Sequence, residues 1–483
     1  MKIVEELRLI TIAIVAFMIL LSCIQTVEAQ TISLDEYLTL VKQNNPFFVS
    51  ESLSVEISVE SQARHLGDKD WLAESSPFIS YDDRSGLYNT TYNKSSQIQI
   101  NGSLQKRVWK TGGRFSMSYT SSYSDQDYRT LFSGNPSELF RQQLSVTYSH
   151  PLLKNQGGVL DRLEYELAAF VIDFTEVQSQ ENQENFLLSA GISFLDWILM
   201  EEQLRINKER LLLAEEELKS AKEKFEAHLI DKVDVLRQED ALRIAEQNVV
   251  LSQSLASAKQ TELAIFAQSP SIADSKPDYD IYAPVVISDI EGVIGRLNAE
   301  SRLLRAIDIL VDQTTMKTEG LTSQTRPQLD LNLGTVLIED DESYGKSFGV
   351  DNPSLFVGLQ FTYPLGNHTT KADIKRSEIE LQQLKSDQKS IFLDLEASIR
   401  GITIQIKEME RVLELNLGQI ESAQERTREE TKIYEQGRGD MTFVIQSQDN
   451  EANARLTYLQ NAVAYHKLVL QYRALLDQLL DSE

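Results

Sequence analysis

Side chains that could do chemistry are few in this chain, and they are scattered. The five histidines are His65, His150, His228, His368 and His466. None has the His-Glu-x-x-His spacing that puts two imidazoles on one helix face to bind zinc. The single cysteine, Cys23, has no partner for a disulfide within the chain. The glycine pairs at 112–113 and 157–158 lack the lysine or glycine spacing of phosphate-binding loops. We therefore expect no enzyme, no cofactor and no bound metal.

The amino-terminal segment predicts export from the cytoplasm. Residues 10–21 form an almost uninterrupted apolar run that follows two basic side chains, and Ala29 ends a small-residue cleavage site. This pattern is typical of a secretory signal peptide over residues 1–29, and its apolar run is too short to span a bilayer as a mature helix. A competing interpretation makes Cys23 the lipid-anchored amino terminus of a lipoprotein. We favour cleavage after Ala29.

The charge of the chain limits its partners. The formal net charge is -26, which disfavours nucleic acid and anionic headgroups and suits a path for cations or neutral solutes. A solvated acidic surface on long helices explains the same charge equally well. No other stretch approaches 18 consecutive apolar residues, so any contact of the mature chain with a membrane would have to be made by strands.

Two long tracts carry the same seven-residue apolar repeat, 209 positions apart. The second tract has Phe392, Ile399, Ile406, Leu413, Ile420, Thr427 and Tyr434, and the first has Leu204, Leu211, Leu218 and Phe225. Subtracting 209 superposes Asn416 on Asn207. A repeat held this long describes helices wound on other helices, so each tract needs neighbours to bury its apolar stripe. The duplication supplies one such neighbour within the chain.

Each half has the same predicted order: short helix, helix, strands, very long helix, tight turn and returning helix. We place the first repeat at 30–268, with strands at 77–150 and a helical hairpin at 157–268. A proline-containing linker follows at 269–287. The second repeat occupies 288–483, with strands at 327–363 and a hairpin at 369–481.

The helices that open each half have identifiable bounds. Ser33 and Glu36 predict a capping box at the start of a short helix, and Ser288 with Glu291 repeats it. After Pro46 a helix is expected to run to about residue 75, and its counterpart to span 299–324.

The predicted strands alternate apolar and polar residues, which gives each strand two different faces. The alternating apolar residues include Ile98, Ile100 and Leu104, then Phe115, Met117 and Tyr119, then Leu144 and Val146, and then Leu355, Val357 and Leu359. Such a sheet suits a soluble sandwich or an outer-membrane barrel. Aromatic residues at segment ends, such as Tyr148 and Tyr363, favour the barrel.

This order of elements resembles the TolC-like outer-membrane efflux family over essentially the whole mature chain. The turn segments 225–236 and 434–445 are similar to the family's aromatic, glycine and Asp-Val-Leu signature, and residues 30–37 are typical of such proteins. The resemblance implies a mainly α-helical fold with a β-barrel portion. Long antiparallel helical hairpins would form an α-helical barrel, and trimerisation would complete the transmembrane strands.

The resemblance also implies a function and partners. The chain would be an outer-membrane channel of a Gram-negative-type bacterium with a large periplasmic portion, the exit duct of a tripartite efflux pump or a type I secretion system. Its partners would be two further copies, a periplasmic adaptor, an inner-membrane pump and outer-membrane lipid. An oligomer also follows independently, because four to six strands cannot close a barrel and an open edge in lipid leaves backbone groups unpaired.

Members of the family have four strands per chain, and this sequence offers up to six. Residues 97–123 have no counterpart in the second half, and the turn at Thr111-Gly112-Gly113 makes them a hairpin. We expect this additional hairpin to decorate the extracellular end of the barrel rather than to enlarge it.

The resemblance places a closed periplasmic end at the two turns. Asp234 and Tyr434 match a family aspartate and tyrosine that latch the closed state, whereas the latch arginine falls at Gly439, with Arg438 one residue earlier. The constriction would be formed by Phe443 and Gln446, an apolar and amide ring that cations should block weakly. The residues assigned to the turns and to adaptor docking are His228, Leu229, Gly437, Gly439 and Asp440.

Structural interpretations of the same residues stay open. Tyr434 continues the apolar heptad, and Asp234 suits a helix cap. Gly437 and Gly439 suit left-handed turn conformations, and His228 suits an exposed loop. The competing function is a periplasmic coiled-coil adaptor or scaffold without a membrane barrel, which leaves the alternating strands unexplained. The cargo, whether drug, metal or protein, is not encoded in a recognisable motif.

Overall fold

The computed structural model describes residues 31–83, 92–128, 136–287, 289–349 and 353–480. The predicted signal peptide, Cys23 and Ser288 lie outside these ranges. The chain forms two compact units. The first comprises Met1–Glu51, Glu181–Arg296 and Asp394–Glu483, and the second comprises Ser52–Gln180 and Leu297–Leu393.

Four long helices confirm the predicted duplication. Helix α4 spans Val159–Glu226 and α5 spans Lys232–Phe266, while α8 spans His368–Glu435 and α9 spans Met441–Leu475. Each bound in the second half equals its counterpart plus 209. Within the described residues, no helix is both long and apolar enough to cross a bilayer.

Several of the heptad residues are buried as a coiled coil requires, whereas Phe225, the last of the first tract, is 40% exposed. Ile399 and Ile406 have no exposed surface. Asn416, which belongs to the same predicted helical seam, is also buried. The Asn461 side-chain amide donates to the Asn416 carbonyl at 2.7 Å, and Asn207 donates to the Ser252 hydroxyl at 2.6 Å in the equivalent place of the other hairpin. Because a buried polar group must find its partner, these pairs favour one helix register.

The shorter helices agree with the sequence except at one boundary. Helix α2, Leu34–Asn44, starts with the predicted capping box of Ser33 and Glu36. Helices α6, Ile290–Glu300, and α7, Arg302–Gln324, also lie where they were expected. Helix α3, Pro46–Arg64, ends earlier than the predicted residue 75, because a short 3₁₀ turn at His65–Lys69 leads into a strand instead.

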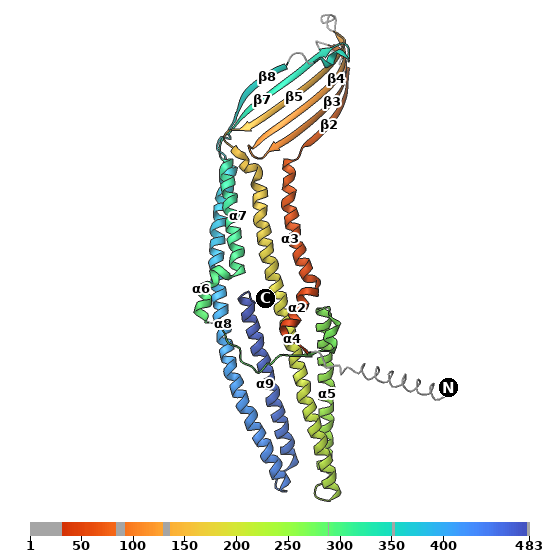
Figure 1. The fold of residues 1–483 in the computed structure, drawn as a ribbon, viewed down its shortest axis with the longest axis vertical. Coiled ribbons are helices and arrows are strands. Elements are labelled where there is room, and N and C mark those ends of the chain that lie inside the picture. The colour runs from red at the N-terminus through yellow and green to blue at the C-terminus, as the bar shows by residue number, and fades with distance from the viewer. Residues whose placement is uncertain (1–30, 84–91, 129–135, 288, 350–352, 481–483) are drawn as a thin grey trace, which may run out of the picture. The chain divides into compact units, whose positions relative to one another are not determined.

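Six antiparallel strands form one sheet in the order β2-β3-β4-β5-β7-β8 (Figure 1). Their bounds are Leu72–Asp83, Tyr92–Val108, Gly113–Tyr128, Glu138–Pro151, Gln328–Asp341 and Pro353–Thr362. Every residue of β2 pairs with a residue of β3, so the first strand starts at Leu72 and not at the predicted residue 77. A second, two-stranded sheet pairs β1, Thr31–Ile32, with β6, Lys276–Pro277.

The additional hairpin is part of the main sheet, so our prediction that it decorates one end is wrong. Strands β3 and β4 lie between β2 and β5 and pair with both over their length. The offset between the halves falls from 256 at α3 and α7 to 209 at α4 and α8, so the first half carries 47 additional residues. These residues build two full strands.

The register gives the sheet two chemically different faces. We call the first the apolar face, and it carries Ile79, Ile98, Ile100, Leu104, Met117, Leu144, Val146, Leu333, Leu337, Leu355, Val357 and Leu359. We call the second the polar face, and it carries Gln97, Gln99, Asn101, Ser103, Ser116, Ser118, Thr120, Ser122, Ser145, Thr147 and Asn332. Phe78, Val336, Ile338 and Phe356 are apolar exceptions on the polar face.

The linker between the halves packs on α9 through a buried histidine. His466 is 2% exposed, and its two ring nitrogens lie 2.9 Å from the Tyr279 hydroxyl and 2.9 Å from the Ile281 carbonyl oxygen. Burial lowers the pKa of His466, and this outweighs the opposing effects of the Ile281 carbonyl and the Asp280 charge. The folded chain therefore favours the neutral imidazole.

This histidine should make the stability of the helical unit depend on pH. Because its pKa is lower in the folded state, the unfolded state binds the proton first, so stability is lost as the pH falls below about 6.5. We expect His466→Gln to flatten the fall in urea midpoint between pH 8 and pH 5. His228→Gln, at an exposed histidine, is the matched control. Parallel pH profiles for His466→Gln and the unchanged protein would contradict this account.

Candidate functional site

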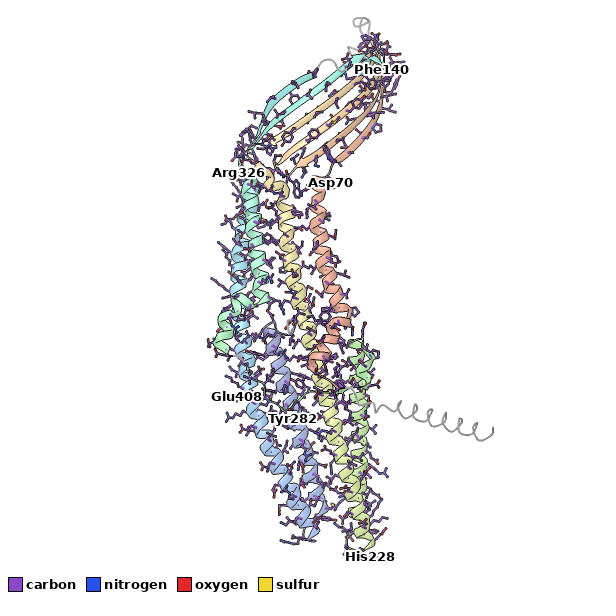
Figure 2. All side chains as sticks on the ribbon, viewed as in Figure 1. Asp70, Phe140, His228, Tyr282, Arg326 and Glu408 are labelled. Atoms are coloured by element: carbon purple, nitrogen blue, oxygen red, sulfur yellow. The ribbon has the colours of Figure 1, made fainter. Side chains whose placement is uncertain are left out.

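Two equivalent turns join the long helices, and Figure 2 marks the first of them at His228. His228 has φ 56° and Gly437, 209 positions later, has φ 68°. In each turn two backbone amides bond back to the last helical turn, His228 to Phe225 at 2.9 Å and Gly437 to Tyr434 at 2.9 Å among them. This is the left-handed helix end that glycine favours. His228 and Leu229 are exposed at the first turn.

Gly439 differs from Gly437 in its conformation. It has no positive φ, so the left-handed role that we expected for it falls to Gly437 alone in this turn. A side chain on Gly439 would approach the Ile433 side chain at 3.1 Å and the Tyr434 backbone nitrogen at 3.2 Å. A side chain at this position would be crowded, because the chain passes close to the end of α8.

Asp440 caps α9. Its carboxylate accepts a hydrogen bond from the Thr442 backbone amide at 2.8 Å, whereas the equivalent Asp231 makes no such bond to α5. Hydrogen bonding by Thr442, and to a lesser extent the charge of Arg237, holds the pKa of Asp440 below its ordinary value. Asp440 is therefore ionised at any physiological pH.

Arg237 connects the two hairpins at this end. Its Nη1 donates to Asp234 Oδ1 at 3.2 Å on its own helix and to Asp440 Oδ1 at 3.2 Å at the start of α9. Beside it the buried Gln238 amide lies 2.9 Å from the Met441 sulfur. Arg237 is 42% exposed, so water weakens its ion pairs and they can open at modest cost.

Tyr434 lies in the same cluster with a free hydroxyl. Within the described part of the chain, its buried oxygen has no hydrogen-bond partner. Burial raises the pKa of Tyr434, and the negative charges of Asp234 and Asp440 raise it further. The Lys224 ammonium lies 4.9 Å from the centre of its ring. The structure thus brings Tyr434, Asp234 and Asp440 together without a direct bond from the tyrosine to either carboxylate.

Arg438 takes no part in this cluster. Its side chain is exposed, and no ion pair of it occurs among the residues that the structure describes. Sequence reasoning missed Arg237 and Lys224. Arg237 stands three residues after Asp234, where a helix brings opposite charges together, so this spacing was an available signal.

The two residues assigned to the constriction share one face of α9. Phe443 is 56% exposed and Gln446 is also exposed, while Met441 and Val444 are buried in the coiled coil. Both side chains therefore stand away from the packed seam. The duplication relates Phe443 to Asp234 and Gln446 to Arg237, so the latch and constriction positions are equivalent in the two halves.

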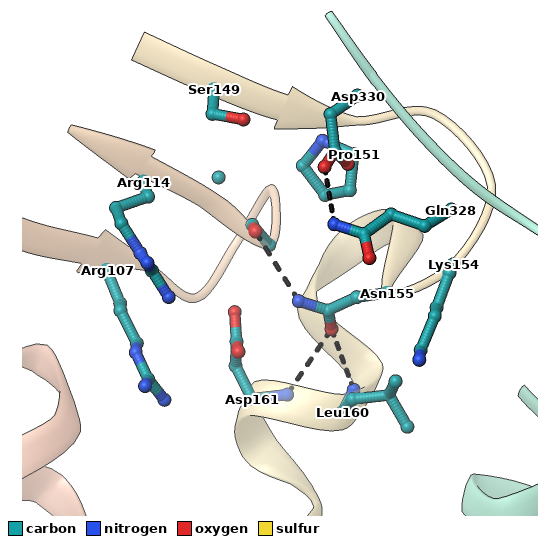
Figure 3. A pocket seen from close by; sticks show the side chains of 12 residues that line it. Arg107, Arg114, Ser149, Pro151, Lys154, Asn155, Leu160, Asp161, Gln328 and Asp330 are labelled. Carbon is teal, nitrogen blue, oxygen red and sulfur yellow. Dashed lines mark hydrogen bonds between the residues drawn. The ribbon is translucent and has the colours of Figure 1, made fainter. Parts of the chain in front are cut away.

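A polar cavity of about 340 Å³ lies in the second unit, beside the start of α4 (Figure 3). Its charged lining residues are Arg107, Arg114, Lys154, Asp161 and Asp330. Asn155 organises one wall, because its side-chain oxygen accepts from the Leu160 amide at 2.9 Å and its nitrogen donates to the Gly112 carbonyl at 3.4 Å. The cavity is the place where the β3–β4 turn meets α4.

The fold is shared with solved outer-membrane channels. The first of these is CusC, whose crystal structures concern folding and transmembrane channel formation. It aligns with a TM-score of 0.67 at 10% identity over 92% of this chain and 91% of its own. The outer membrane protein VceC from Vibrio cholerae gives 0.65 at 10% identity over 92% and 96%. The Campylobacter jejuni CmeC outer membrane channel gives 0.64 at 11% identity over 92% and 85%.

These similarities confirm the predicted fold class, mainly helical with a sheet portion. At such low sequence identity they establish the fold of this chain and do not establish its function. No model of a known protein family matches the sequence, and no curated protein matches it either.

Proposed function

We propose that this chain is an outer-membrane exit duct, which passively conducts solutes across the periplasm and outer membrane as a homotrimer. A periplasmic adaptor and an inner-membrane pump would load it. One observation carries the proposal: a six-stranded sheet with one predominantly apolar face and one predominantly hydroxyl and amide face, in a chain with the fold of outer-membrane channels. Lipid would contact the apolar face, and water would contact the polar face.

Aromatic residues flank the apolar face at both ends, as rings do at membrane interfaces. At the end near the helices, the Trp71 and Phe115 ring centres are 5.7 Å apart. At the other end, Tyr123 and Phe140 are 4.8 Å apart, and Phe140 also meets Tyr344. The stretch from Phe115 to Tyr123 is roughly 27 Å long along the strand, about the length that a tilted strand needs to cross the hydrocarbon core of a bilayer.

The competing adaptor or scaffold would place this face in water. Ile79, Leu355 and Val357 are 76%, 81% and 75% exposed. A contiguous apolar surface of this size is unusual for a soluble monomer and favours contact with lipid.

Within the helical hairpins, we propose that Asp234, Arg237, Tyr434 and Asp440 hold the duct closed. The contacts of Arg237 carry this proposal, because they link the first hairpin to the second. Phe443 and Gln446 would narrow the pore there. The exposed turn residues His228 and Leu229, with Gly437, Gly439 and Asp440 of the second turn, would meet the adaptor.

Membrane insertion is tested by placing one charge on either face of β3. We expect Ile100→Arg to impair outer-membrane assembly, because an arginine that faces lipid costs up to about 2–4 kcal/mol, depending on its depth in the bilayer. Gln99→Arg, on the neighbouring position of the polar face, should assemble normally. Fractionation, heat-modifiable gel migration and dye release from liposomes measure the difference. A soluble periplasmic protein that tolerates both substitutions equally would overturn the proposed function.

A further inference from the structure

The additional hairpin separates β2 from β5 along their whole length. Strand β3 pairs with β2 from Leu72 and Gln105 to Asp83 and Lys94. Strand β4 pairs with β5 from Arg114 to Asp125. No position remains at which β2 and β5 can bond to each other, so the sheet has six neighbouring strands rather than four with an appendage.

The hairpin also continues both faces of the sheet. Its outward apolar residues Ile98, Ile100 and Leu104 are 48%, 55% and 42% exposed, and the alternate positions carry serine, threonine, asparagine and glutamine. If the hairpin projected into extracellular water, its apolar side would be exposed to water, which is unfavourable. This pattern suits strands that cross the lipid with the others.

The hairpin turn is anchored at the helical end of the sheet. The Thr111 hydroxyl lies 2.8 Å from the Tyr148 hydroxyl of β5. Arg162 of α4 donates to the Trp109 carbonyl at 3.2 Å, and Trp109 is buried. The strands of the hairpin therefore run the full height of the sheet, from this turn to the opposite end.

Strand direction makes the two edges of the sheet complementary. Strand β2 leads away from the helices and β8 leads back to them, so β8 of one copy and β2 of another are antiparallel when placed side by side. The ladder and both faces would continue across that junction. Within the described residues neither outer edge has a strand partner, and an open edge is not viable in lipid. Pro77 has no backbone N–H, so β2 lacks one hydrogen-bond donor at this position.

We propose that three copies close a barrel of 18 strands, six from each chain, by pairing β8 with β2 of the next copy. This rests on the proposed function. Because barrel diameter grows roughly in proportion to strand number, the pore would be about 1.5 times as wide as one built from four strands per chain. Its wall is mostly uncharged, with Ser116, Ser118 and Thr120 on β4. The outer-membrane part would pass large hydrophilic solutes without selecting by charge.

Electron microscopy of the full-length complex in lipid nanodiscs tests the strand count. We expect 18 strands in a threefold assembly. Twelve strands, whether from three chains with the hairpin excluded or from two complete chains, would overturn the proposal and leave an outer-membrane channel intact. A particle without any barrel would instead overturn the proposed function, so the two failures are distinguishable.

Cysteine crosslinking tests the junction in the native membrane. Cys23 is the only native cysteine and lies in the predicted signal peptide, so any crosslink comes from the engineered cysteines. We expect Ile79→Cys to form covalent oligomers with Leu355→Cys, Val357→Cys or Leu359→Cys, depending on the register between copies. As a control, Ile79→Cys with Leu144→Cys should not crosslink, because three strand spacings, about 14 Å, separate them. A bond in the control pair without any at the junction would overturn the proposal.

Discussion

Replacing Arg237 with glutamine should raise the single-channel conductance of the assembled duct severalfold. The substitution removes the contact between Arg237 and Asp440, which links α5 to α9, and leaves the carboxylates of Asp234 and Asp440 without the cation that they share. Like charges at this distance repel, so the closed arrangement loses an attraction and gains a repulsion. Conductance in planar bilayers at low and high salt measures the change, which should shrink as salt screens the charges.

The magnitude follows from exposure and symmetry. Arg237 is 42% exposed, and an ion pair this accessible to water contributes little by itself. The same contact occurs in each of the three copies that we propose, so one substitution removes it three times. A severalfold change is therefore expected, and the oligomer should keep its heat-modifiable migration.

Arg438→Gln is the matched control because it removes the same charge from the same end of the molecule. Arg438 is exposed and makes no ion pair within the described residues, so its loss should leave conductance nearly unchanged. If Arg438→Gln opens the duct and Arg237→Gln does not, the arginine next to the position implied by the family resemblance holds the duct closed. If neither variant changes conductance, this cluster does not hold the duct closed.

The long helices could be predicted from sequence because their signal is repeated many times. A seven-residue spacing over several turns has few structural solutions, and the duplication tested it within the chain itself. The half-buried Asn207 and the buried Asn416 show why the register tolerates two polar residues in an apolar seam. Each has a partner at the same place in its hairpin.

The additional hairpin was misjudged because its strands were visible but their pairing was not. The alternation of apolar and polar residues around Ile98 and Phe115 predicts strands, but it does not predict which strands pair with each other. The second half offered no counterpart to residues 97–123, so the family's strand number decided the expectation. Pairing depends on contacts far apart in sequence, such as those of β2 with β3 and β4 with β5.

The proposed latch shows a second limit of prediction from the sequence. Matching positions to the family pattern placed the latch arginine at Gly439, with Arg438 one residue earlier, because sequence comparison records only order along the chain. A helix brings residue 237 back to residue 234 after one turn, and the packing of the two hairpins then brings it to Asp440. The first relation was visible in the sequence, and the second required the fold.

Gly158→Ala should destabilise the junction of sheet and helix far more than Gly157→Ala. Both glycines have positive φ, 73° and 69°, so each alanine costs about 1–2 kcal/mol of backbone strain. A side chain on Gly157 meets nothing within 4 Å, whereas one on Gly158 would collide with the Trp109 carbonyl oxygen and approach the Gly112 nitrogen at 3.2 Å.

The collision involves backbone atoms on both sides, so it cannot be relieved by turning a side chain. The hairpin turn at Trp109 to Gly112 would have to move off α4, and the strands that it anchors would lose their fixed end. We expect Gly158→Ala to lower the thermal midpoint of the purified full-length oligomer well beyond Gly157→Ala, and to reduce the yield of heat-modifiable oligomer. Equal effects of the two substitutions would mean that strain alone acts here and that the turn does not depend on its close contact with α4.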